Sequence, residues 1–159
     1  MNTFLKAAGR EATLAFVGEE INAYARALQQ RWRRRDRGAA LPRVMFLEKL
    51  DPAAIAAAYC AADVFLYTSR LDVQPLVLLD AMAAGTPFLS TDVGCVREFP
   101  GGLVAPGLRP LAGALRRLLA DDALRSTLSE AGLAASRRYY NWPCVLDRYE
   151  QLLGRLCDS

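Results

Sequence analysis

The sequence predicts an α/β fold in which a parallel sheet is covered by helices on both faces. Short apolar runs, typical of buried strands, alternate with segments whose apolar residues recur at helical spacing. Glycine, proline and capping residues separate these segments. Repeated strand–helix units favour parallel strands joined by right-handed crossovers. A chain of 159 residues is expected to form one domain (1–159) with a sizeable core.

The first part of the chain contains two predicted strands and a long helix. Asn2 to Ala8 resembles the tail of a helix, and Ala12 to Val17 is an apolar run that ends at Gly18. Glu19 to Arg34 is predicted to be a helix with acids in its first turn and arginines in its last. Arg43 to Leu47 is predicted as the second strand.

The middle of the chain repeats the strand–helix pattern. Asp51 and Pro52 are expected at the cap and first position of a helix that runs to Ala61. A helix over Pro75 to Ala84 is closed by Gly85. The remaining predicted strands are Asp63 to Thr68, Pro87 to Ser90 and Gly101 to Ala105.

The chain becomes helical after Gly107. Asp121 to Tyr140 is predicted as one helix, and Asn141 is expected to cap the last one. Two apolar stripes mark the flanking helices: Leu111, Leu115, Leu118 and Leu119 in the first, and Val145, Leu146, Tyr149, Leu152, Leu153 and Leu156 in the last.

The composition excludes several kinds of chemistry. The chain has no histidine, which excludes histidine-based triads and histidine general bases. Its four cysteines are scattered without a Cys-x-x-Cys pair, so we expect no metal site and reduced thiols in a cytoplasmic protein. No signal peptide or membrane-spanning run is visible.

One basic run departs from the small net charge of +3. Arg31 to Arg37 closes the first long helix, where arginines complement the helix dipole and keep the helix end hydrated. An anionic membrane or partner surface is the alternative.

Two acids flank the most informative segment. Asp72 and Asp80 lie eight positions apart, with an apolar helical run between them. A carboxylate just before a helix and a second one two turns along it can both face a pocket at the carboxyl end of a strand, where open α/β sheets bind ligands. The alternative is an N-terminal cap and a solvated helix position.

Several stretches, taken in order, resemble one family. The chain resembles the C-terminal, donor-binding domain of the family 4 retaining glycosyltransferases, which have two Rossmann-like domains in the GT-B architecture. The stretches that carry the resemblance are Leu14 to Gly18, Val44 to Leu47, Tyr59 to Phe65, Ala81 to Pro87, Thr91 to Gly94, Arg97-Glu98 and Trp142.

The resemblance implies a role for the two acids. In the family a Glu-x7-Glu pair binds a nucleotide sugar, which implies that Asp80 contacts the ribose hydroxyls and Asp72, the catalytic candidate, the donor sugar. The resemblance also implies backbone amides that face the sugar and phosphate, with no cofactor and no metal. The other substrate-binding candidates are Leu76, Val77, Ser69 and Arg70, together with Gly18, for which a turn glycine is the alternative.

The sequence also departs from the family pattern. Both acids are aspartates, one methylene shorter than glutamate, and Val73 and Pro75 occupy the positions of two glycines. The family's first strand, its Arg and Lys that neutralise the diphosphate, and its N-terminal acceptor domain have no counterpart here. We therefore expect the isolated chain to be inactive.

The predicted function is donor binding in an enzyme that transfers a hexose from a nucleotide diphosphate sugar to a glycan or lipid-linked acceptor. A non-catalytic interaction module and a sugar-nucleotide epimerase are the alternatives. No nucleic acid partner is expected. A cytoplasmic location is expected, with the inner face of a membrane as a further possibility.

Aromatic and leucine side chains near the C-terminus suggest a further partner. In the resembling family the closing helix crosses back to the N-terminal domain, so these side chains could form an exposed surface that promotes self-association. Burial in the core is the alternative. The residues concerned are Tyr139, Tyr140, Trp142, Leu152, Leu153 and Leu156.

Overall fold

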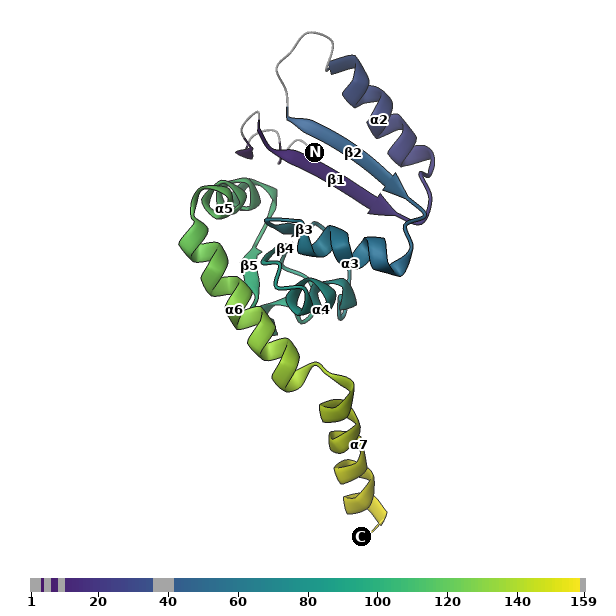
Figure 1. The fold of residues 1–159 in the computed structure, drawn as a ribbon, viewed down its shortest axis with the longest axis vertical. Coiled ribbons are helices and arrows are strands. Elements are labelled where there is room, and N and C mark those ends of the chain that lie inside the picture. Colours follow the sequence, from purple (N-terminus) through teal and green to yellow (C-terminus); the bar gives the residue numbers. More distant parts are fainter. Residues whose placement is uncertain (1–3, 5–6, 9–10, 36–41, 158–159) are drawn as a thin grey trace.

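The computed structural model describes the chain apart from residues 1–3, 5–6, 9–10, 36–41 and 158–159 (Figure 1). Strands and helices alternate from β1 to α5, two further helices follow, and every strand pair is parallel. This arrangement confirms the predicted α/β class. The elements in order are β1 (Thr13–Gly18), α2 (Ala23–Arg35), β2 (Arg43–Glu48), α3 (Pro52–Cys60), β3 (Phe65–Tyr67), α4 (Leu76–Ala83), β4 (Phe88–Thr91), the 3-10 turn η1 (Val96–Glu98), β5 (Gly102–Ala105), α5 (Leu108–Ala120), α6 (Asp122–Tyr139) and α7 (Trp142–Cys157).

The strands form two sheets rather than one. β1 pairs with β2, and β4 lies between β3 and β5 in the second sheet. In the three-stranded sheet Tyr67 lies opposite Ser90, and Ser90 opposite Val104. Among the described residues, β1, β2, β3 and β5 therefore each keep one edge without a strand partner.

Helices cover both faces of the three-stranded sheet, as predicted. Successive strand residues point to opposite faces, so Leu66 of β3 packs on one core cluster while its neighbours pack on the other. The first cluster is built on Leu111, Leu115 and Leu118 of α5. The second contains Leu78 and Met82 of α4, with Phe65 and Tyr67 packed against it.

The predicted helix boundaries follow from local chemistry. Asp51 caps α3, because its Oδ1 accepts the Ala54 N–H at 2.7 Å and proline follows at the first helical position. Gly85 has a φ of 73°, the left-handed conformation that ends α4 at little cost for glycine. Asn141 caps α7 by accepting the Cys144 N–H at 3.0 Å.

The start of α2 differs from the prediction. The helix begins at Ala23 rather than Glu19, and its first turn contains no acid. The reason is Asn22, whose Oδ1 accepts the Ala25 N–H at 2.9 Å and so caps the helix three residues later. The glutamates before it remain outside the helix.

Two predicted segments fall partly outside the described residues. For Asn2 to Ala8 the description covers only positions 4, 7 and 8, where the Ala8 N–H donates to the Phe4 carbonyl at 2.8 Å in a helical pattern. Phe4 is buried in the first core cluster. Residues 36–37 of the basic run are outside the description, and neither role predicted for this run is tested by the fold.

Helix α7 projects from the end of the molecule opposite to β1, β2 and α2 (Figure 1). It has no buried residue, and Trp142 keeps 75% of its surface exposed. Tyr140, by contrast, packs edge-on against Phe99 with ring centroids 5.7 Å apart. The expected exposed apolar surface is therefore present on α7. Of the helices in the described part of the chain, none combines the length and apolar character needed to cross a membrane.

Candidate functional site

Two loops meet at the carboxyl edge of the three-stranded sheet. Residues 68–75 connect β3 to α4, and residues 92–95 follow β4. The Thr91 hydroxyl donates to the Ser69 carbonyl at 2.6 Å, and the Cys95 N–H donates to the Val73 carbonyl at 3.0 Å. These bonds join the loops where parallel α/β sheets bind ligands.

Asp72 is half-buried in the first loop, and both of its carboxylate oxygens accept hydrogen bonds. The Tyr67 hydroxyl donates to Oδ2, and the Gln74 N–H donates to Oδ1 at 3.1 Å. Burial, and then the hydrogen bond to Asp72, raise the pKa of Tyr67 above its usual value. The phenol therefore remains a donor at neutral pH.

Gly94 lets the second loop approach Asp72. Its φ of 50° lies in the left-handed region. A Cβ atom at this position would lie 2.6 Å from the Asp72 carbonyl oxygen, and closer still to that of Val73. Only glycine allows the two backbones to pack this closely.

Asp80 lies in a different environment. It is exposed at the start of the second turn of α4, one turn nearer the helix N-terminus than predicted. The pKa of Tyr59 in α3 is raised mainly by burial and, to a smaller extent, by the negative charge of Asp80. Within the described chain, no hydrogen bond or ion pair joins Asp80 to Asp72, so the two predicted acids have separate neighbours.

The N-terminus of α4 offers two backbone donors. Leu76 and Val77 are its first residues, and Pro75 provides no side-chain cap. The N–H groups of both have no acceptor among the described residues, as expected for a first helical turn. The preceding loop carries exposed apolar side chains, with Leu71 88% and Val73 81% exposed.

The other predicted site residues lie in different environments. The Ser69 hydroxyl donates to the Leu71 carbonyl at 3.0 Å, so Ser69 shapes the first loop. Arg70 is exposed. Gly18 ends β1 in the other sheet, where its carbonyl accepts the Lys49 N–H at 3.3 Å. Since α2 begins only at Ala23, Gly18 does not adjoin a helix N-terminus as predicted.

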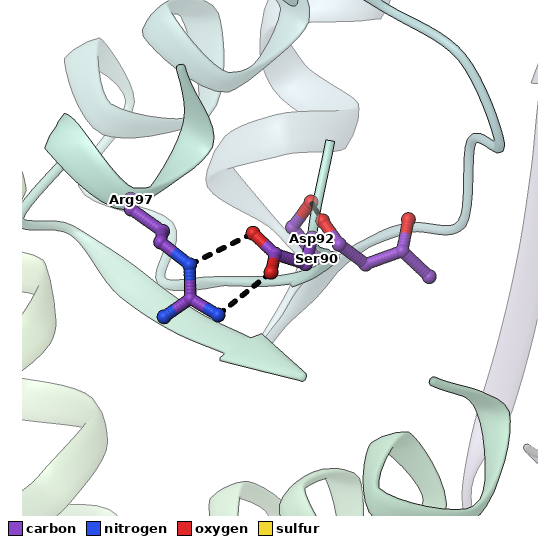
Figure 2. Close-up of polar contacts among 4 residues, drawn as sticks. Ser90, Asp92 and Arg97 are labelled. Carbon is purple, nitrogen blue, oxygen red and sulfur yellow. Dashed lines mark hydrogen bonds and ion pairs between the residues drawn. The ribbon is translucent and has the colours of Figure 1, made fainter. Parts of the chain in front are cut away.

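An ion pair next to the site was not predicted. Figure 2 shows Arg97 of η1 bound through two nitrogens to the Asp92 carboxylate, with donor–acceptor distances of 2.8 and 2.7 Å. The pair lowers the pKa of Asp92 and raises that of Arg97, mainly through these hydrogen bonds. The neighbouring Glu98 forms no salt bridge within the described chain, although its charge contributes, after burial, to the raised pKa of Tyr140.

The described residues contain no group of three or more histidine, cysteine, aspartate or glutamate side chains that could hold a metal ion. The chemical groups available at the carboxyl edge are therefore carboxylates, hydroxyls, free helix amides, the exposed guanidinium of Arg70 and the guanidinium of Arg97, which is paired with Asp92. Such groups suit a polyhydroxylated or anionic ligand.

Comparison with known proteins assigns the family. Residues 2–121 match the family described as "Glycosyl transferases group 1". This chain belongs to the group 1 glycosyltransferases. The match agrees with the resemblance to family 4 glycosyltransferases.

Individual relatives support the same family. The chain is 37% identical over 129 residues to a phosphatidyl-myo-inositol mannosyltransferase of Mycobacterium leprae, a match that covers 77% of this chain and 34% of that protein. It is 34% identical over 132 residues to a GDP-mannose-dependent α-mannosyltransferase of Mycolicibacterium smegmatis, with 72% and 32% covered. The chain thus spans about a third of these relatives' length.

A solved structure supports the fold. Sucrose-phosphate synthase from Thermosynechococcus elongatus superposes with a TM-score of 0.76 at 29% identity, covering 91% of this chain and 38% of the synthase. The fold is therefore Rossmann-like, as in GT-B glycosyltransferases.

Proposed function

We propose that this chain is the donor-binding domain of a retaining glycosyltransferase that transfers a hexose from a nucleotide diphosphate sugar to a glycan or lipid-linked acceptor. In this proposal Asp80 binds the ribose hydroxyls and Asp72 the donor sugar. The free N–H groups of Leu76 and Val77 face the sugar or phosphate, and Ser69 and Arg70 line the loop. The observation that carries the proposal is a β3–α4 loop that presents a fixed carboxylate and free helix amides at the carboxyl edge of a glycosyltransferase fold.

Physical chemistry supports this assignment. A carboxylate can accept hydrogen bonds from two neighbouring hydroxyls, which suits a ribose or hexose diol. Amides at a helix N-terminus favour an anion through their direction and the helix dipole. The two relatives described above are a phosphatidyl-myo-inositol mannosyltransferase and a GDP-mannose-dependent α-mannosyltransferase, which fits a hexose donor and a lipid acceptor.

Transfer by the whole enzyme would need further groups. Front-face transfer with retention requires charge stabilisation on the leaving diphosphate. The described edge around Asp72 offers two guanidinium groups, the exposed Arg70 of the β3–α4 loop and Arg97, which is already paired with Asp92. The edge strands of the two sheets have free edges to which a further strand could be added. We propose that further polypeptide supplies this strand, the basic groups and the acceptor site. A lipid acceptor would place the enzyme at the inner face of a membrane.

The test is a titration of the 159-residue chain with UDP, GDP and ADP and their glucose or mannose conjugates, followed by backbone amide NMR. The expected result is chemical shift changes over residues 72–81 for one nucleotide, lost in Asp80→Ala. Asp147→Ala, which removes an exposed acid from α7, is the matched control and should keep the changes. Changes that persist in Asp80→Ala would contradict the assigned ribose contact.

A non-catalytic interaction module is the second candidate, and two observations favour it. Pro75 has no N–H to offer at the helix cap, and Asp72 already serves as an acceptor within its own loop. The exposed apolar side chains of α7 would provide the interaction surface, with a second copy of the chain as the partner. The module would be favoured if the parent chain self-associates with rising concentration, Leu153→Ser does not, and no nucleotide changes the NMR spectrum.

A further inference from the structure

We infer that Tyr67 is a positioning residue that holds the Asp72 carboxylate in the orientation needed to contact the donor sugar. The inference rests on the proposed function, since it assigns a role to a residue behind the proposed sugar contact. Nothing in the sequence pattern singled out Tyr67, which lies in an apolar run. The structure brings its hydroxyl to Asp72.

The ring of Tyr67 is fixed by the sheet and the core. Tyr67 is the last residue of β3, and its backbone is held in register opposite Ser90 of β4. The ring stacks with Phe65 at a centroid distance of 6.5 Å, and both rings pack on the core cluster that includes Met82. A phenol anchored in this way presents its O–H at a constant position on the carboxyl edge.

The carboxylate is held from two sides and keeps capacity for a ligand. Tyr67 donates to Oδ2 and the Gln74 N–H donates to Oδ1, which fixes the rotation of the carboxylate plane. A carboxylate has about four lone-pair positions, so about two remain for sugar hydroxyls. The short aspartate side chain keeps the group close to the end of β3, within reach of the phenol.

The backbone beneath Asp72 is fixed as well. The Val73 carbonyl accepts the Cys95 N–H at 3.0 Å, and Gly94 packs against the Asp72 carbonyl. With the main chain held from one side and the carboxylate from the other, removal of the phenol hydroxyl should release the side chain without releasing the loop. This separation makes Tyr67→Phe an informative substitution.

The test compares intact sugar nucleotides with the nucleotides alone by calorimetric titration of the 159-residue chain. The probe pairs are UDP-glucose and UDP, GDP-mannose and GDP, and ADP-glucose and ADP. Tyr67→Phe should weaken the intact sugar nucleotide about three- to tenfold, the usual effect of one lost hydrogen bond, and leave the nucleotide unchanged. Tyr149→Phe is the matched control, because Tyr149 is an exposed tyrosine of α7, away from the β3–α4 loop. This substitution should leave the affinities for the sugar nucleotide and for the nucleotide unchanged.

A spectroscopic readout tests the contact without any ligand. In Asp72→Asn the Gln74 N–H still has an amide oxygen to bind, so the loop is expected to fold. The tyrosine ring carbons, observed by NMR during alkaline titration, should show Tyr67 ionising at lower pH than in the parent chain, because one cause of its raised pKa is removed.

The outcomes separate the two proposals. If the parent chain binds none of the probes, the donor site and the role of Tyr67 both fail. If it binds and Tyr67→Phe leaves the ratio of sugar-nucleotide to nucleotide affinity unchanged, the donor site stands and the role of Tyr67 fails. An unchanged Tyr67 titration in Asp72→Asn would also overturn the inference.

Discussion

Gly94→Ala should destabilise the fold, because Gly94 is the point at which the two site loops pack against each other. The substitution forces a side chain into a backbone conformation with φ of 50°, which costs about 1–2 kcal/mol. The new Cβ would also overlap the Val73 carbonyl, which is held in place by the Cys95 N–H. Breaking that hydrogen bond to make room costs about 0.5–1.5 kcal/mol. The total loss in free energy of unfolding is therefore about 1.5–3.5 kcal/mol.

Urea and thermal unfolding followed by circular dichroism measure this loss. A change of about 1.5–3.5 kcal/mol in a domain of this size lowers the melting temperature by about 3–14 °C. Gly113→Ala is the matched control, because a Cβ there meets no atom within 4 Å inside helix α5. The control should be stabilised by about 0.5–1 kcal/mol, since alanine favours a helix over glycine. A Gly94→Ala chain as stable as the parent would refute the argument from close packing of the loops.

Two further predictions concern a helix cap and an ion pair. Asp51→Ala should lower the free energy of unfolding by about 1 kcal/mol through loss of the cap on α3, measured by urea unfolding, and Asp51→Asn should largely restore it. Arg97→Gln should return the lowered pKa of Asp92 toward 3.8, measured by carboxyl-carbon NMR. Because the pKa of Asp92 is lower in the folded chain, the stabilisation from the ion pair is complete above pH 3.8 and is lost as the pH falls through the folded-state pKa. If the parent chain and Arg97→Gln unfold in acid with the same midpoint pH, this prediction is contradicted.

Much of the fold could be predicted because the relevant signals are local. Asp51 and Pro52 identify the start of α3 through the chemistry of a capped first turn. Gly85 identifies the end of α4 because few residues adopt its positive φ. The leucine spacing of α5 predicts its buried face, and Leu111 and Leu118 are indeed fully buried.

The differences arise where two signals compete or where pairing depends on distant parts of the chain. Acids are common in a first helical turn, so Glu19 and Glu20 suggested a start that Asn22 overrides with a hydrogen bond. Sheet order depends on which strands meet in space. An apolar run therefore predicts β1 and β3 but not that each lacks a neighbour on one edge in the described structure.

The site shows the same limit. The spacing of Asp72 and Asp80 around a helical run could be read directly from the sequence, whereas their separate neighbours could not. Tyr67 lies in a run that indicates only a buried strand, and its contact with Asp72 depends on the path of the loop. In the sequence Gly94 is only one residue of a stretch that resembles the family. The need for glycine at this position, which follows from the close approach of the Val73 backbone, is visible only in the structure.

The rigidity of the β3–α4 loop argues for a ligand rather than a simple connection. Connecting loops are usually among the more mobile parts of a domain, and ordering each residue costs about 1–2 kcal/mol in conformational entropy. Here Tyr67, Thr91 and Cys95 all donate hydrogen bonds to residues of one short loop. The left-handed conformation of Gly94 lets the backbones of the two site loops pack together. Such ordering is useful when a ligand must meet its binding groups already in place, because less freedom is then lost on binding. The same network that makes Asp72 structurally important is therefore what would make it an effective sugar contact.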